Sequence, residues 1–367
     1  MKAAFPHMGN LEIPMRALIE NLGAEVVTPP RPSRKSIELG AKYSPEFVCL
    51  PFKANLGDLM GALKMGADTL LSVLGSWSCR FGYYGRLHHE ILRDLGWEFE
   101  SILLGKESWR RIWDTVFRLN GQKKGRTARS IWHAFRVGWR KSRLVELAED
   151  LARKARPCEL SRGLATKVLR DSLELVRGSE TVTGLHRAER EIRERFGAIK
   201  RDEELRPLRI YVVGETYVVL EPAVNFDLER RLGEMGIYVE PFLTVHRWLI
   251  HPLKLGLRGE YGELAARKRA VPYLRYPLGG EDQQAIGFTI LASERGFDGV
   301  IHLQPFTCMP ETVAHQILLE VKREYPIPVL SLSLDEHSAE AGVLTRVEAF
   351  VDLLARRRGK NPISKSA

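Results

Sequence analysis

The sequence contains few cysteines and no long apolar segment. Only four of its 367 residues are cysteine, and none forms a C-x-x-C pair, which excludes the ligand spacing of zinc ribbons and bacterial ferredoxins. No apolar run reaches the ~18 residues of a membrane-spanning helix. The first residues, MKAAFPHMGNLEIP, carry one lysine and no long apolar stretch, unlike a secretory signal. We therefore expect a cytoplasmic protein without membrane spans, whose cysteines are thiols or metal ligands.

Motifs for ATP hydrolysis are missing as well. The sequence has no Walker-type G-x-x-x-x-G-K-[ST] motif, and Gly9 and Asn10 after the first apolar run lack the rest of a G-x-G-x-x-G fingerprint. We expect no ATP site in this chain, so any ATP hydrolysis that it needs would be performed by another protein.

The positive charge is concentrated in one segment. The formal net charge is +10, and residues 106–143 hold twelve Lys and Arg against Glu107 and Asp114, whereas the other residues balance at 44 of each sign. Four of the seven tryptophans fall among these cations: Trp109, Trp113, Trp132 and Trp139.

This basic segment has three interpretations. It can form a small helical core that buries the tryptophans under arginine stems, which is the interpretation we favour. It can present a docking face for an acidic partner or for CoA phosphates. It can also bind nucleic acid, because cations follow the phosphate backbone and aromatic rings stack on bases.

The alternation of apolar and amphipathic runs predicts an α/β protein. Residues 1–104 and 206–367 alternate strand-like runs, including EFVCLPF and LRIYVVG, with helical ones, which is typical of parallel sheets. Residues 105–205 contain long charged helical runs and no strand-like run. The sequence therefore predicts two Rossmann-like domains, at 1–104 and 206–367, separated by a basic helical domain at 105–205, with a closing helix near the C-terminus.

Three cysteines fall at predicted strand ends. Cys49 ends the run EFVC, Cys79 lies a few residues beyond TLLSVLG, and Cys308 follows DGVIHL. Because ligands of open parallel sheets gather at the carboxyl ends of the strands, facing domains would bring these thiols together across a cleft and leave one metal position open. Isolated cysteines can equally be small apolar fillers. Cys158, in the helical segment, fits no such pattern.

Other polar residues flank the same predicted edge. His7 ends the first strand and could contact substrate or act as an acid or base. Lys53 and Arg80 lie close to cysteines in the sequence and could stabilise an anionic cofactor or a thioester carbonyl. Glu336 and His337 follow the last predicted strand and could line a site, although helix capping would also explain acids there.

A His-His pair interrupts the helical run after Cys79. His88 and His89 are about 100° apart on a helix, so they would not easily face one metal ion. We expect one of them to be buried and the other to be exposed.

Long segments of both α/β regions resemble a known family. KYSPEFVCLPFKANLGD, SCRFGYYGRLHHEILRDLG, GFDGVIHLQPFTCMPE and LSLDEHSAEAG look like the proteins related to 2-hydroxyacyl-CoA dehydratases. More closely, they resemble the dehydratase-like component associated with CoA-enzyme activases and double-cubane iron–sulfur proteins. The resemblance spreads through both α/β regions and falls away in the helical segment.

The resemblance implies a cysteine-ligated 4Fe–4S cluster, or a linked pair of clusters as in the double-cubane proteins. Cys49, Cys79 and Cys308 match its ligand positions. It also implies an ATP-hydrolysing activase or reductase as electron donor, and a second dehydratase-like subunit or a homodimer as a further partner. It raises the expectation that Glu336 and His337 line the site.

Three positions depart from the family pattern. Ser78 stands where relatives have Gly or Pro, Glu281 where we expect a histidine, and Ser338 where Thr is usual. The substitution at Glu281 bears most directly on substrate contact.

The resulting functional prediction is radical dehydration of an acyl-CoA, or reduction of a small molecule, with low-potential electrons. Two alternatives remain, and a zinc ion at the same thiolates is a third possibility. The chain could be a non-catalytic component that relays electrons or assembles such a system, or it could bind nucleic acid through the basic segment with inert cysteines.

Overall fold

The computed structural model describes residues 1–74, 79–105, 116, 128–250, 260 and 262–359. Contacts group the chain into two compact units, Met1–Leu151 with Lys167–Ala198, and Ala152–Thr166 with Ile199–Ala367. The division into three domains at residues 104 and 205 stays a prediction.

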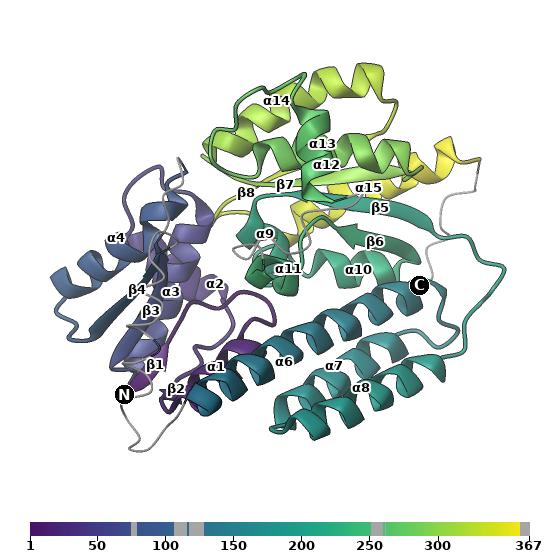
Figure 1. Ribbon diagram of the computed structural model, residues 1–367. Coiled ribbons are helices and arrows are strands. Elements are labelled where there is room, and N and C mark those ends of the chain that lie inside the picture. The colour runs from purple at the N-terminus through teal and green to yellow at the C-terminus, as the bar shows by residue number, and fades with distance from the viewer. Residues whose placement is uncertain (75–78, 106–115, 117–127, 251–259, 261, 360–367) are drawn as a thin grey trace. The chain divides into compact units, whose positions relative to one another are not determined.

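The first unit is built on a four-stranded parallel sheet (Figure 1). Its strands lie in the order β2-β1-β3-β4. They are β1 (Lys2–Ala4), β2 (Glu25–Val26), β3 (Thr69–Leu74) and β4 (Glu100–Gly105). The connecting helices are α1 (Glu12–Leu22), α2 (Arg34–Tyr43), α3 (Leu50–Lys64) and α4 (Phe81–Asp94).

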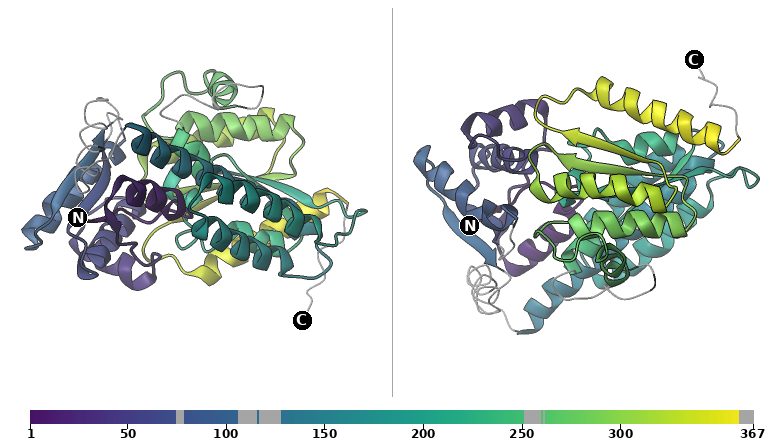
Figure 2. Two further views of the ribbon diagram at one scale, coloured as in Figure 1. Left: turned by 60° about the horizontal axis from the view of Figure 1, so that its bottom comes forward. Right: turned by 90° about the horizontal axis from the view of Figure 1, so that it is seen from above.

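The second unit repeats this topology. Its parallel strands lie in the order β6-β5-β7-β8, with α13 and α14 on one face of the sheet and α10 and α15 on the other (Figures 1 and 2). The strands are β5 (Leu208–Gly214), β6 (Ile237–Pro241), β7 (Gly299–Pro305) and β8 (Val329–Leu334). The helices are α9 (Thr216–Leu220), α10 (Leu228–Glu234), α11 (Val245–Ile250), α12 (Glu263–Ala270), α13 (Asp282–Glu294), α14 (Met309–Glu324) and α15 (Glu340–Arg357). Two all-parallel sheets with helical connections confirm the predicted α/β, Rossmann-like fold class.

Apolar side chains on both faces of each sheet form the cores. In the first unit, α3 and α4 pack Phe52, Leu56 and Leu92 on one face, while α1 and the start of α6 (Ala128–Ala155) cover the other. In the second unit, α12, α13 and α14 pack around Ile286 and Val300. Burial on both faces explains why these strands are nearly continuous apolar runs.

The chain between β4 and β5 is helical in its described part, as predicted. Besides α6, its described part contains a short 3-10 helix (Arg156–Cys158), α7 (Leu164–Gly178) and α8 (Val182–Gly197).

The interpretation that the basic segment, residues 106–143, buries its tryptophans is wrong for two of them. The exposed fractions of Trp132 and Trp139, both on α6, are 70% and 39%. Trp109 and Trp113, with most of the basic segment, lie outside the described residues.

One predicted strand is wrong. The run EFVCLPF does not form a strand, because Cys49 is the N-cap of α3 and Pro51 lies in the first turn of that helix. Proline is favourable there, since its missing N–H has no helical acceptor at that position. A short apolar run does not distinguish a strand from a buried helix start.

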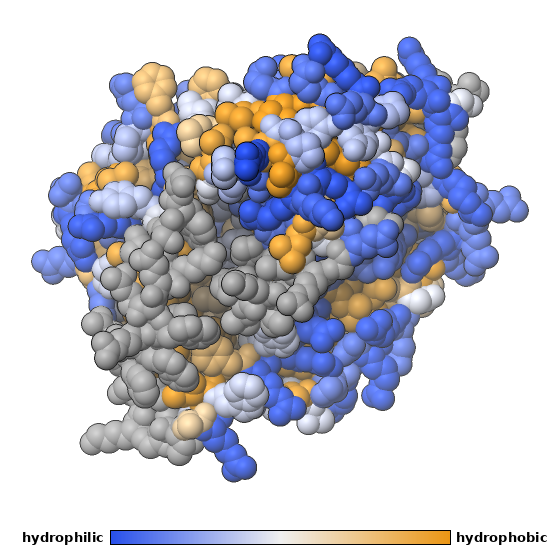
Figure 3. Space-filling model, turned by 45° about the horizontal axis from the view of Figure 1, so that its top comes forward, coloured by the Kyte–Doolittle hydropathy of each residue, from blue (hydrophilic) through white to orange (hydrophobic). Residues whose placement is uncertain are grey.

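Hydrophilic side chains cover much of the face that Figure 3 shows, with apolar ones between them. Among the described residues, no helix has the length and apolar composition to cross a bilayer.

Candidate functional site

Cys49 and Cys308 are each a buried N-cap residue at the start of a helix. Both stand in a Cys-x-Pro sequence, both have extended backbone, and both are buried, with α3 and α14 beginning at the next residue. The N-terminus of a helix carries partial positive charge, which favours a thiolate over a thiol. This local geometry therefore suits both cysteines as metal ligands.

The loop of Cys79 is joined to the loop of Cys49 in the first unit. Arg80, the N-cap of α4, donates from its guanidinium to the Phe47 carbonyl at 3.0 Å, which joins the two cysteine loops. The Tyr84 hydroxyl, one turn into α4, hydrogen-bonds to Cys49 Sγ. The structure thus brings the loops of Cys49 and Cys79 to the same edge of the first sheet.

The two units place their site residues at matching points of the topology. In the first unit, Cys49 caps the helix that leads into the third strand, and Cys79 precedes the helix after that strand. In the second unit, Glu281 caps α13 before its third strand, and Cys308 caps α14 after it. Glu281 therefore occupies the position in the second unit that Cys49 occupies in the first.

Three carboxyl groups lie around this edge of the second sheet, of which Glu215 and Glu311 are buried and Glu281 is half-buried. Glu215 caps α9 through the Val218 N–H at 2.9 Å, and Thr216 Oγ1 donates to Glu281 Oε1 at 2.6 Å. Burial and the neighbouring Glu281 raise the pKa of Glu215 to about 8. Burial also raises the pKa of Glu281 to about 7, and nearby Glu311 adds to this effect. Charge at one carboxylate raises the cost of charge at the next.

Glu311 and His302 form the most deeply buried polar pair of this group. Both side chains are fully buried, with 2.7 Å between His302 Nε2 and Glu311 Oε2. Burial lowers the pKa of His302 to about 4, whereas burial and the charge of Asp282 raise the pKa of Glu311 to about 8. Near neutral pH, the protonated carboxyl therefore donates to a neutral imidazole. Glu311 Oε1 is buried without a hydrogen-bond partner among the described residues.

Sequence analysis did not identify Glu215, Glu311 or His302 as site residues. The signal available was position: Glu215 directly follows β5, and Glu311 is the third residue after Cys308. Their burial depends on the packing of α13 and α14, which the sequence pattern does not reveal.

His7 and Lys53 lie near the cysteine loops of the first unit. His7 is buried just beyond β1, and its backbone N–H donates to Asp58 of α3 at 3.1 Å. Lys53 is half-buried one turn after Cys49 on α3. Both residues are therefore anchored to the helix that Cys49 caps.

Glu336 and His337 follow β8 at the edge of the second sheet. A turn closed by the Asp335 carboxylate and the Ser338 hydroxyl, at 2.8 Å, holds this loop. His337 is 85% exposed, and its Nε2 lies 3.8 Å from Glu336 Oε1, while the Glu336 side chain is largely covered. Of the two, only His337 is freely accessible to solvent.

The expectation that one of His88 and His89 is exposed is wrong, because both are buried. His88 Nε2 donates to the Phe52 carbonyl at 3.0 Å, and burial lowers its pKa to about 3. His89 contacts the Ser72 and Ser101 hydroxyls at 3.0 and 2.5 Å, and burial lowers its pKa to about 4. Helix α4 packs against both α3 and the sheet, so it covers two adjacent positions.

The described residues contain no cluster of three or more His, Cys, Asp or Glu side chains that could hold a metal ion. Cys49 and Cys79 belong to the first unit and Cys308 to the second. The donor set itself suits an iron–sulfur cluster, because such clusters are held by cysteine thiolates. The meeting of the three thiols stays a prediction.

Comparison with known proteins shows the family to which the chain belongs. A family model described as 2-hydroxyglutaryl-CoA dehydratase, D-component, matches residues 106–354. This range contains Cys308, begins after Cys49 and Cys79, and includes the helical segment, where we expected the resemblance to fall away. No curated protein matches the chain.

Proposed function

Because the chain belongs to the family of the 2-hydroxyglutaryl-CoA dehydratase D-component, we propose that it is the dehydratase-like, iron–sulfur component of an activase-dependent system. Its reaction would be radical dehydration of an acyl-CoA, or reduction of a small molecule. The observation that carries this proposal is the shared placement of Cys49 and Cys308, each a buried N-cap residue within a Cys-x-Pro sequence.

Cys49, Cys79 and Cys308 would hold a 4Fe–4S cluster, or one of a linked pair. When bound, the cluster supplies single-electron reduction, with electrons from an ATP-hydrolysing activase. Arg80 orients the Cys49 loop through its bond to the Phe47 carbonyl. The Tyr84 hydroxyl is hydrogen-bonded to the Cys49 sulfur and would donate to a thiolate there. Lys53 would offset negative charge at the same edge.

The acidic residues of the second unit would donate protons in the reaction. Removal of a hydroxyl group as water consumes a proton. Burial keeps the Glu311 carboxyl protonated near neutral pH and raises the pKa of Glu281 to about 7. Such groups can act as general acids. Glu281 stands where the family pattern predicts a histidine, so a carboxyl group would take over that contact. His7, Glu336 and His337 would line the remainder of the edge.

Reduction by a purified CoA-enzyme activase tests this proposal. The anaerobically purified chain, mixed with reduced activase, should give a paramagnetic cluster signal only when ATP is added. Turnover of a 2-hydroxyacyl-CoA would identify a dehydratase, whereas reduction without turnover would identify an electron-relay or assembly component, the first alternative. A signal that is independent of ATP would contradict the activase partnership.

One observation keeps the nucleic-acid alternative in consideration. Trp132, Phe135 and Trp139 are exposed on α6 at helical spacing, with Arg136 exposed beside them. An exposed face of aromatic and cationic side chains can bind a single strand. Salt-dependent retention on single-stranded DNA or RNA that is lost on Trp132→Ala would support this function.

A further inference from the structure

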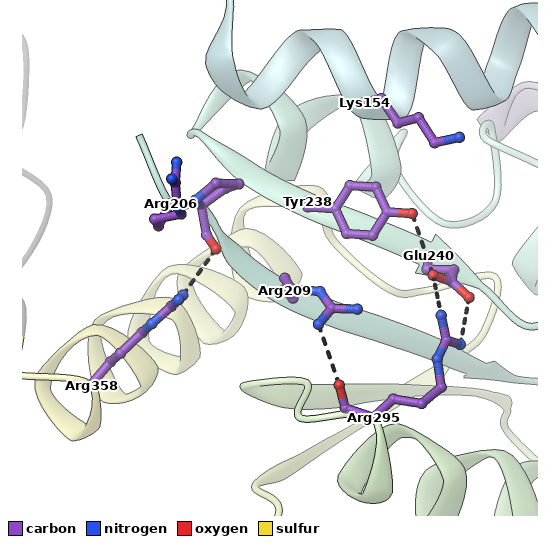
Figure 4. A pocket seen from close by; sticks show the side chains of 8 residues that line it. Lys154, Arg206, Arg209, Tyr238, Glu240, Arg295 and Arg358 are labelled. Atoms are coloured by element: carbon purple, nitrogen blue, oxygen red, sulfur yellow. Dashed lines mark hydrogen bonds and ion pairs between the residues drawn. The ribbon is translucent and has the colours of Figure 1, made fainter. Parts of the chain in front are cut away.

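A cation-lined pocket lies in the second unit, away from the candidate site. Its volume is about 400 Å³, within the range of small-molecule sites. All of its lining residues belong to the second unit, and Figure 4 shows them around the start of β5. They are Lys154, Arg206, Pro207, Arg209, Tyr238, Glu240, Arg295 and Arg358.

The pocket lies at the amino ends of the strands. Arg206 and Pro207 immediately precede β5, and Arg358 immediately follows α15. Cys308 lies beyond the carboxyl end of β7, which runs parallel to β5. Seven residues at about 3.3 Å each place the two sheet edges ~20 Å apart. The pocket is therefore distinct from the edge that carries Cys308 and Glu311.

Five cations and one carboxylate line this pocket. Such a concentration of like charge is unfavourable by itself and attracts anions, because the repulsion is relieved when a ligand neutralises it. Asp298, next to the lining, adds one more acid through its ion pair with Arg358 at 3.2 Å. The lining nevertheless remains strongly cationic.

Hydrogen bonds hold two of the guanidinium groups in place. Arg295 forms a two-bond pair with Glu240, at 2.7 and 3.0 Å, and the Tyr238 hydroxyl donates to the same carboxylate at 3.3 Å. Arg358 Nη1 donates to the Pro207 carbonyl at 2.9 Å. These contacts fix the walls before any ligand arrives, which lowers the entropy cost of binding.

Arg209 is positioned by an aromatic ring. Its guanidinium carbon lies 4.1 Å from the centre of the Phe297 ring, and its Nη1 donates to the Arg295 carbonyl at 3.3 Å. No carboxylate accepts a bond from this guanidinium among the described residues. Figure 4 shows the Tyr238 ring between Lys154 and Arg209 in this view, where it offers an aromatic surface close to the cations.

We propose that this pocket binds a small molecule that carries a diphosphate group. Guanidinium groups match phosphate oxygens in planar, paired hydrogen bonds, and several of them around one volume suit a ligand with more than one phosphate. The Tyr238 ring would stack on a base or another planar group attached to the diphosphate. Because the pocket is remote from Cys308, its ligand is not the molecule being transformed there.

Isothermal titration of the full chain tests the site with three probes: inorganic pyrophosphate, ADP and CoA. All three carry a diphosphate, and only ADP and CoA carry a base. If pyrophosphate binds with the same affinity as ADP, the pocket recognises the phosphates alone. Tighter binding of ADP and CoA would add the base as a recognised group, and CoA tighter than ADP would show that the pocket also recognises the 3'-phosphate or the pantetheine arm of CoA.

The double variant Lys154→Ala/Arg206→Ala removes two cations from the pocket rim. We expect it to weaken the tightest probe by at least about tenfold, since hydrogen bonds to charged groups are worth about one to two factors of ten each. The matched control, Lys322→Ala/Arg323→Ala on α14, removes one lysine and one arginine elsewhere in the same unit and should leave affinity unchanged.

Two results would contradict the proposal that this pocket binds a diphosphate. One is that no probe binds at millimolar concentration to a chain whose folding is verified by circular dichroism. The other is that both double variants weaken binding equally, because this would make net charge, and not the pocket, responsible. Neither result depends on the iron–sulfur cluster, so the proposed function is tested separately.

Discussion

His302 and Glu311 meet inside the second unit, with 2.7 Å between Nε2 and Oε2 and no solvent access to either side chain. His302 lies on β7, and Glu311 lies in the first turn of the helix that Cys308 caps. His302 Nδ1 is 3.3 Å from the Ser331 hydroxyl. With Glu311 protonated, Nε2 accepts the Glu311 hydrogen bond, so the neutral imidazole carries its proton on Nδ1, where Ser331 can accept a hydrogen bond. A buried proton is therefore held close to a proposed cluster ligand.

Stability should fall as the pH rises through the pKa of Glu311. Its pKa is about 8 in the folded protein, against an ordinary value of 4.5, so the folded chain binds more protons than the unfolded chain between these values. Glu215 and Glu281 act in the same direction. Each proton of difference changes the free energy of unfolding by about 1.4 kcal/mol per pH unit.

The variant Glu311→Gln isolates this contribution. Glutamine keeps a donor for His302 and cannot ionise, so urea unfolding should show a shallower loss of stability between about pH 6.5 and pH 8. The exposed control Glu320→Gln, on the same helix, should behave like the wild type. Equal pH slopes in the wild type and Glu311→Gln would contradict a protonated Glu311.

Acid should destabilise the first unit through its buried histidines. The folded pKa values of His88 and His89, about 3 and about 4, lie below the ordinary value of 6.5, so the unfolded chain binds more protons in between. Their contribution is complete above pH 6.5 and is lost as the pH falls toward 4, by about 1.4 kcal/mol per pH unit for each proton.

His89→Gln tests this acid sensitivity. Glutamine can hydrogen-bond to Ser72 and Ser101 without titrating, so the variant should lose less stability than the wild type between pH 6.5 and pH 5 in thermal unfolding. His337→Gln, at a side chain that is 85% exposed, should leave the pH profile unchanged. An unchanged profile in His89→Gln would mean that His89 does not titrate as a buried neutral group.

The contact between α2 and α3 depends on a glycine. A Cβ atom on Gly40 of α2 would lie 1.9 Å from the Lys53 carbonyl oxygen of α3. Gly40→Ala must therefore move α2 away from α3, the helix that Cys49 caps. We expect a loss of about 1–3 kcal/mol in the free energy of unfolding, typical of overpacking. Gly342→Ala on α15, where a Cβ meets nothing within 4 Å, should stabilise by up to about 1 kcal/mol. Equal changes in the free energy of unfolding for Gly40→Ala and Gly342→Ala, measured by chemical denaturation, would contradict this packing.

Periodicity was sufficient for the long elements of the fold. The run LRIYVVG predicts β5 at Leu208–Gly214, and the charged run that begins at Ala128 predicts α6, because a mostly apolar run of seven residues and a helical pattern of about eight turns are both clear. Helices α9 and α11, with five and six residues, are too short to show a helical period. Cys49 was assigned to a strand end because its apolar neighbours fit a strand as well as a helix start.

The candidate site was predictable only where chain order determines it. Residues that follow a parallel strand lie at its carboxyl edge, which places Cys79 and Cys308 correctly without any knowledge of packing. The burial of Glu311 and the stacking of Arg209 on Phe297 arise between segments that are distant in sequence. Composition alone favoured burial of Trp132, but its side chain is exposed, because no neighbouring element in the described part of the chain covers it.

Iron and acid-labile sulfide per chain, measured after purification without oxygen, test the central claim most directly. The wild type should contain about four of each, or more for a double cubane, and Cys49→Ala, Cys79→Ala and Cys308→Ala should each lose them. Cys158→Ala, at the half-buried cysteine of the 3-10 helix, should retain them. A folded wild type without iron, or iron that survives in all three variants, would contradict the assignment of a cluster to these cysteines.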